Sequence, residues 1–152
     1  MHLSGEQSGK NSAAAANVGT PAGAVTRPMT SIDAYLAGGG LGPPDIIKID
    51  VEGYEGFVLR GAAEALAASP TLLFELHPEL QANCGCDAGE VLDVVFARYR
   101  WVFLVDELND VLRPCSRADL DKPGAIGLYR SDLVAIGRPE HLAAVRQWHD
   151  PS

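Results

Sequence analysis

The sequence has little positive charge, few cysteines and no long hydrophobic run, and each shortage excludes a class of protein. Its 12 Lys and Arg face 20 Asp and Glu, and the net charge of −8 argues against a nucleic-acid partner, because phosphate binding needs clustered basic side chains. No run of about 18 apolar residues occurs, so no segment is expected to span a membrane. Residues 1–20 lack the charged-then-apolar order of a secretory signal, which makes the cytoplasm the expected compartment.

The number and spacing of the cysteines argue against a disulfide framework and against a zinc or redox site. Cys84, Cys86 and Cys115 are odd in number, which argues against a disulfide framework. Cys84 and Cys86 form a C-x-C pair with one distant Cys, a spacing that matches neither a zinc site nor a C-x-x-C redox pair. Reduced, structural thiols are the favoured interpretation, and no metal site is predicted.

What is present has the composition of one globular domain: 152 residues, 47% hydrophobic and 21% charged. Residues 1–24 are rich in Ser, Gly and Ala and are expected to form a flexible segment, at best a weak ribbon. Residues 25–131 carry the patterns of regular structure, and residues 132–152 are expected to be a C-terminal helical tail.

Strand and helix patterns alternate, which predicts an α/β fold with a mostly parallel sheet. Strands are expected at residues 24–29, 45–51, 71–77, 101–105 and 125–129. No helix precedes the last strand, so it is the candidate for antiparallel pairing. Helices are expected from about Ser31, at 54–68, at 87–99 with Asp87 as the cap, and at 140–148.

Two of the expected strands end in polar residues that a core would not select. The segment from Asp50 to Glu55 (DVEGYE) follows one strand, and His77 ends the next. Ligands of open parallel sheets bind where strands end and loops begin, so these residues are candidates for a site. Carboxylates that cap the helix near Tyr54 are a structural alternative, which suits Glu55 better than Asp50.

Charged residues also occur inside these strands. Lys48 and Glu75 each lie two residues before a strand end. Because buried charges need partners, the sequence predicts that they form a buried ion pair between neighbouring strands.

Four segments taken together resemble one known family. They are Thr30-Ser31-Ile32-Asp33, residues 44–55 (PDIIKIDVEGYE), residues 58–62 (VLRGA) and residues 70–77 (PTLLFELH). Their order and spacing are similar to the "TLD" segment, the "D-IK-DVEG-E--VL-GA" core and the "P-ilfE-h" strand of the FkbM family of S-adenosyl-L-methionine-dependent methyltransferases.

The resemblance implies a Rossmann-like (class I methyltransferase) fold and S-adenosyl-L-methionine as the cofactor. The family holds this donor mainly with a Gly-rich loop after an early strand, and nothing before residue 30 offers one. The chain is therefore expected to be a partial domain, the C-terminal half without the N-terminal donor-binding half, and inactive alone. A non-enzymatic remnant or a partner-binding half-domain is the alternative.

Carried over residue by residue, the resemblance assigns roles to four positions. Asp50 is expected to be catalytic and to line the donor, and Glu52 and Gly53 are expected to complete the donor-binding residues of this half. Gly53 would also permit the tight turn from strand to helix. His77 is the candidate general base, although it could instead cap its neighbouring loop. The acceptor is expected to be a small molecule or sugar methylated on oxygen. A metal-dependent α/β enzyme that uses Asp50, Glu52 and His77 is a further alternative.

Overall fold

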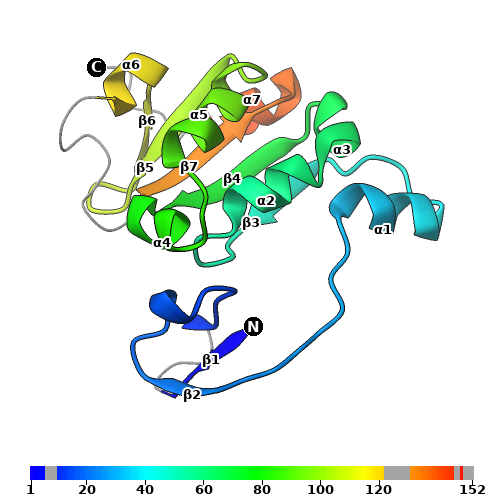
Figure 1. The fold of residues 1–152 in the computed structure, drawn as a ribbon. Coiled ribbons are helices and arrows are strands. Elements are labelled where there is room, and N and C mark those ends of the chain that lie inside the picture. Colours follow the sequence, from blue (N-terminus) through cyan, green and yellow to red (C-terminus); the bar gives the residue numbers. More distant parts are fainter. Residues whose placement is uncertain (6–9, 122–130, 146–147, 149–152) are drawn as a thin grey trace.

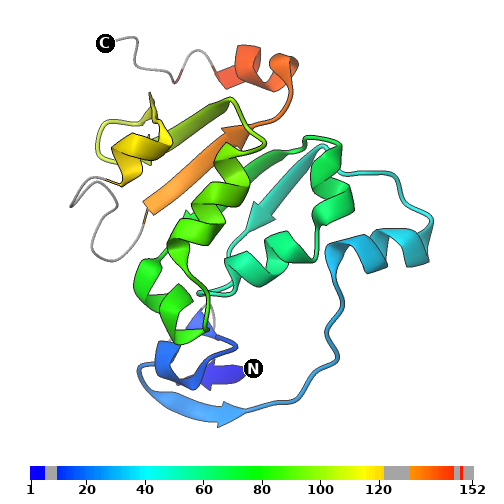
Figure 2. The ribbon, with the colours of Figure 1, turned by 45° about the horizontal axis from the view of Figure 1, so that its top comes forward.

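The computed structural model describes residues 1–5, 10–121, 131–145 and 148 (Figure 1). Its body is a five-stranded sheet in the order β3-β4-β7-β5-β6. The strands are β3 (Ile46–Ile49), β4 (Thr71–Leu76), β5 (Trp101–Asp106), β6 (Val111–Pro114) and β7 (Ser131–Ile136). Among the described residues β3 is therefore one edge of this sheet, and Figure 2 shows it there.

The prediction of a mostly parallel sheet is wrong. Among the described strands only β3 and β4 pair in parallel, whereas β4 with β7, β7 with β5, and β5 with β6 are antiparallel. Strands β3, β4 and β5 do run in one direction, but β7 runs against them and lies between β4 and β5. Strand β6 returns from β5 through a short turn, so no crossover helix separates them.

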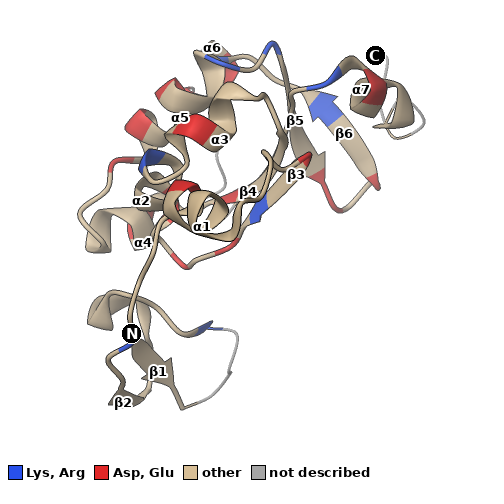
Figure 3. Ribbon diagram, turned by 90° about the vertical axis from the view of Figure 1, so that its right-hand side faces the viewer, with Lys and Arg blue, Asp and Glu red and all other residues tan. Residues whose placement is uncertain are grey.

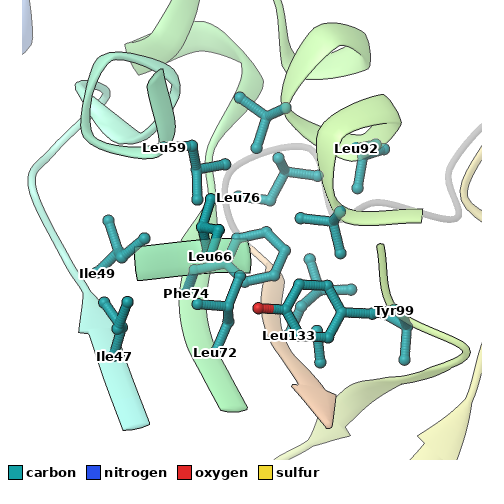
Figure 4. Close-up of a cluster of buried hydrophobic side chains, with 14 of the residues drawn as sticks. Ile47, Ile49, Leu59, Leu66, Leu72, Phe74, Leu76, Leu92, Tyr99 and Leu133 are labelled. Carbon is teal, nitrogen blue, oxygen red and sulfur yellow. The ribbon is translucent and has the colours of Figure 1, made fainter. Parts of the chain in front are cut away.

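Helices cover this sheet unequally on its two faces. The helices are α1 (Ile32–Gly39), α2 (Glu55–Arg60), α3 (Ala63–Ala67), α4 (Pro78–Asn83), α5 (Ala88–Phe96), α6 (Arg117–Leu120) and α7 (Pro139–Val145). One face packs its inward residues against α2, α3 and α5 in a continuous core (Figure 4). The other face has a smaller cluster in which Leu142 and Val145 of α7 pack against Phe103, Val134 and Ile136. None of the described helices is long and apolar enough to cross a membrane.

Several predicted elements are present with shifted ends. The Ser31 hydroxyl accepts from the Ala34 N–H at 3.1 Å and starts α1, and Asp87 caps α5 in the same way through the Glu90 N–H. The expected helix at 54–68 is divided into α2 and α3 at Gly61. Asp33 explains the division, because its two carboxylate oxygens accept from the Glu64 and Ala65 N–H groups, each at 3.0 Å, and cap α3.

Other predicted elements are wrong or lie outside the described residues. No strand covers residues 25–29: β2 (Pro21–Ala24) ends before them and pairs with β1 (His2–Ser4) in a separate ribbon that precedes the main sheet. The short elements α4, β6 and α6 were not predicted, and neither was β7. The expected strand at 125–129 lies outside the described residues, as do residues 146–147 of the expected terminal helix.

Candidate functional site

The loop that follows β3 contains two residues with a positive φ, which is costly for Glu52 but not for Gly53. Glu52 has φ 51° and Gly53 has φ 99°, both in the left-handed region. A Cβ at Gly53 would lie 2.3 Å from the carbonyl oxygen of Leu80 in α4. Gly53 therefore allows the tight turn that the sequence led us to expect, and it also allows close contact with α4.

A buried carboxylate braces the same loop from the start of α2. Glu55 is 2% exposed. Its Oε1 accepts from the Gly53 N–H at 3.2 Å and from the Val51 N–H at 3.4 Å, while its Oε2 accepts from the Gln81 amide at 3.1 Å. Glu55 does lie in the first turn of α2, as the capping alternative expects, but its partners are the preceding loop and α4. Gln81 is 0% exposed, and its Oε1 has no hydrogen-bond partner among the described residues.

Asp50 lies just beyond the end of β3 and is exposed. Its carboxylate accepts from the Lys48 ammonium at 2.8 Å, and the two side chains are 48% and 69% exposed. The hydrogen bond and the negative charge of Asp50 raise the pKa of Lys48. The predicted buried pair of Lys48 and Glu75 is therefore wrong, because Lys48 lies on the open side of an edge strand and water reaches it.

Lys48, Asp50, Glu75 and Asp132 nevertheless share one open concavity on this face of the sheet. The cavity has a volume of about 300 Å³, and Phe74 and Val134 are among its apolar lining residues. Figure 3 shows the basic segment on β3 and the acidic segments that the helices carry elsewhere. His77 is not among the lining residues, so the cavity does not bring Asp50 and His77 together as we expected.

His77 lies at the carboxyl end of β4 and begins α4. Its Nδ1 accepts from the Leu80 N–H at 3.4 Å, and Pro78 occupies the first helical position. This contact is the capping alternative that the sequence left open. A neutral imidazole whose Nδ1 accepts carries its proton on Nε2, so in this geometry the free side of His77 donates a hydrogen bond.

Glu52 links the two predicted catalytic residues electrostatically. Partial burial and the negative charge of Asp50 raise the pKa of Glu52, whereas His77 and Lys10 lower it. Asp50 and His77 therefore act in opposite directions on the pKa of Glu52.

Two residues of the N-terminal segment contact this loop, and no sequence pattern pointed to either. Ser12 and Asn17 lie in polar chain that was expected to be flexible. Both donate hydrogen bonds to the carbonyl oxygen of Glu52, each at 2.9 Å. Their partners are backbone atoms, which leave no pattern in a sequence. Gln81 was missed for a related reason, because it lies in a six-residue helix that was not predicted.

The thiols and possible metal ligands form no centre among the described residues. No group of three or more His, Cys, Asp and Glu side chains in the described ranges is arranged to hold a metal ion. All three cysteines are free thiols. Burial raises the pKa of Cys115 to about 11 and also raises the pKa of Cys84, which makes both poor nucleophiles at neutral pH.

A sheet with polar residues at the ends of its parallel strands is typical of α/β enzymes that bind their ligands there. The sequence profile of the Methyltransferase FkbM domain matches residues 1–115. The chain therefore belongs to the FkbM methyltransferase domain family. The matched range includes the N-terminal segment as well as the strands that carry Asp50 and His77. No curated protein and no solved structure matches the chain.

Proposed function

We propose that this chain forms the acceptor side of an S-adenosyl-L-methionine-dependent methyltransferase that acts on a hydroxyl group of a small molecule or sugar. The observation that carries the proposal is the position of the loop from Asp50 to Gly53. It lies inside the family-matched range and at the carboxyl end of β3, which pairs in parallel with β4. Ligands of α/β sheets bind at such strand ends.

The described residues fit one side of a donor site. Asp50, Glu52 and Gly53 are the residues of this chain that would contact the donor. The adjoining cavity of about 300 Å³ is at the low end for ligand pockets and is open to solvent. None of the described strands leads into a Gly-x-Gly loop whose amides could approach the donor. We propose that the remaining donor contacts come from outside the described residues.

The methyl-transfer reaction requires little covalent chemistry from the protein itself. The donor supplies a methyl group on a positively charged sulfur, which is already a strong electrophile. The acceptor oxygen forms a bond to the methyl carbon, the carbon–sulfur bond breaks with its electron pair on sulfur, and the hydroxyl proton leaves. Alignment of the acceptor with the donor therefore matters most, and removal of the proton second.

We propose that the carboxylate pair of Asp50 and Glu52 accepts the proton that leaves the acceptor hydroxyl. His77 was the general base expected from sequence, but a base must offer a free lone pair to the proton. With Nδ1 engaged by the Leu80 N–H, the Nε2–H of His77 instead suits a role in orienting the acceptor oxygen.

The test is a methyl-transfer assay of the purified natural protein. It uses S-adenosyl-L-methionine with a labelled methyl group and a panel of hydroxylated small molecules and sugars as acceptors. Asp50→Asn is expected to lower turnover about a hundredfold or more, within the range for lost general base catalysis, with little change in the free energy of unfolding. Glu79→Gln, an exposed carboxylate on α4, is the matched control. Parallel losses of turnover and stability in Asp50→Asn would show that Asp50 is structural. No transfer by the folded wild type to any acceptor would favour the non-enzymatic alternative.

A second variant separates the two roles of His77. His77→Asn keeps a side chain that can cap α4, because Asn is a favourable N-cap, but it removes the imidazole. A fall in turnover at unchanged stability would support contact with the acceptor. Unchanged turnover would leave capping as the role of His77.

Donor binding to the isolated 152-residue chain tests the proposal that this chain forms only one side of the donor site. Calorimetry is expected to show no binding of S-adenosyl-L-methionine at micromolar affinity, because one wall does not bury most of a ligand of this size. One site per chain at micromolar affinity or better would refute the one-sided site, while the assignment of methyl transfer would stand.

A further inference from the structure

Residues 10–18 pack against the loop that carries Asp50 and Glu52, although the two segments are far apart in sequence (Figure 2). Ser12 is 1% exposed and Val18 is 5% exposed, so this contact excludes water. The Ser12 hydroxyl and the Asn17 amide both donate to the Glu52 carbonyl oxygen. The same Asn17 amide donates to the Leu80 carbonyl oxygen at 3.0 Å.

Asn17 therefore ties the loop after β3 to the helix after β4. Its Nδ2 would lie 2.9 Å from a Cβ at Gly53, which shows how closely the loop, α4 and the N-terminal segment meet. Glu52 adopts its left-handed backbone at this junction. Such a conformation persists only where the surroundings fix it, and here its own carbonyl is fixed by two donors.

The orientation of the Asn17 amide is itself determined. Its Oδ1 accepts from the Asn83 amide at 2.9 Å. A flipped amide would place Oδ1 against the carbonyl oxygens of Glu52 and Leu80, which cannot donate to it. Asn17 is thus held with its donors toward the loop.

We infer that Asn17 is a positioning residue, which sets the direction of the Glu52 carboxylate relative to Asp50 and His77 by holding the Glu52 carbonyl. For its effect on catalysis the inference rests on the proposed function, but the geometry it describes does not. The N-terminal segment then forms a third wall of the site, beside the two strand ends.

The ionisation of Glu52 reports on this geometry. The charged groups that act on it are Asp50 and Glu55, which raise its pKa, and His77 and Lys10, which lower it, in addition to partial burial. Lys10 belongs to the same N-terminal segment as Asn17. If the segment releases the loop, Glu52 gains water, which lowers its pKa. The loss of the Lys10 charge acts in the opposite direction but is the smaller effect, so the pKa is expected to fall toward the ordinary value.

The experiment is an NMR titration of the Glu52 side-chain carboxyl in the 152-residue chain. Asn17→Leu keeps a similarly branched side chain but has no donor, and it is expected to lower the Glu52 pKa. Asn83→Ala removes only the outer, exposed partner of Asn17 and is expected to leave the Glu52 pKa unchanged. A Glu52 pKa equal to that of the wild type in folded Asn17→Leu would overturn the inference.

Two further measurements complete the test. If Asn17→Leu does not fold, Ser12→Ala removes one of the two donors to Glu52 and is expected to shift the same pKa downward by less. No shift in folded Ser12→Ala would then count against the inference. In the methyl-transfer assay, Asn17→Leu is expected to lower kcat about tenfold to a hundredfold, the range for a small misplacement. The titration does not depend on methyl transfer, so it tests the role of Asn17 even if no methyltransferase activity is found.

Discussion

The two faces of the sheet are built from the same strands but differ in what covers them. On the face under α2, α3 and α5, alternate residues of β3 and β4 such as Ile49, Leu72 and Leu76 are 0–2% exposed. On the opposite face, their neighbours Ile46 and Leu73 are 56% and 37% exposed. The covered face supplies hydrophobic stability, while the open face carries the charged residues near the candidate site.

The strongest test of this contrast is a pair of leucines that are adjacent in β4. Leu72→Ala removes a side chain that is 1% exposed and is expected to destabilise the protein by about 2–5 kcal/mol, the range for a buried cavity. Leu73→Ala on the open face is expected to lower stability by about 1 kcal/mol or less. Urea unfolding measures both. Similar losses would show that something covers the open face in solution.

Gly53→Ala is expected to have the next largest effect, because it acts on the loop between the faces. The new methyl group would meet the Leu80 carbonyl oxygen at 2.3 Å, on a backbone of φ 99°. Strain and overpacking predict a loss of about 1–3 kcal/mol in thermal or urea unfolding. Gly85→Ala is the control for the backbone alone, since Gly85 has φ 76° with no atom within 4 Å of an added Cβ. An equal loss in both variants would exclude the contact with Leu80 as a cause.

The raised pKa of Glu52 predicts that this residue lowers stability as pH rises. Most carboxyl groups in folded proteins have the opposite effect. The folded-state pKa of Glu52 is raised above 4.5, mainly by burial, so the folded state holds this proton more tightly than the unfolded state. Its contribution is neutral at low pH and becomes unfavourable as pH rises from 4.5 through the folded pKa. Relative to wild type, Glu52→Gln should therefore gain stability over that interval. A constant difference between the two proteins from pH 3 to 7 would contradict the shift.

Asp106 should give the smallest effect, since it is the last residue of β5 and its partners Asn109 and Arg113 are exposed. Hydrogen bonds from Asn109 and Arg113 lower its pKa to about 2. The resulting stabilisation is present above the unfolded value of 3.8 and is lost as pH falls toward 2. Asp106→Asn should therefore weaken the acid dependence of unfolding in this interval. Acid titrations that superimpose for both proteins would exclude the contribution of Asp106.

The sequence predicted the elements whose patterns are long and locally capped. Strands β3, β4 and β5 and helix α5 were found within a few residues, because apolar runs and caps such as Asp87 are local signals. The elements α4, β6 and α6 have no such apolar run: α4 buries Gln81, α6 buries Leu120, and β6 has no fully buried residue. Where β7 enters the sheet depends on pairing with strands far away in sequence, which no local pattern encodes.

The residues of the candidate site also fall into those that the sequence predicted and those that it did not. Asp50, Glu52 and Gly53 could be selected because they follow a buried strand in a specific motif. Ser12 and Asn17 could not, because their partners are main-chain carbonyls 35 to 63 residues away. The residues of β3 alternate between exposed and buried, although most of them are apolar. The apolar Ile46 on the open side gave no sign of that exposure.

The placement of β7 has a consequence for the order in which the chain can assemble. Residues 131–136 are the last of the five described strands in chain order, yet they form the middle of the sheet and hydrogen-bond to both β4 and β5. Until they leave the ribosome, the β3-β4 pair and the β5-β6 hairpin have no common strand between them. The nascent protein therefore consists of two incomplete sheets, and their union depends on contacts between distant residues, which form slowly.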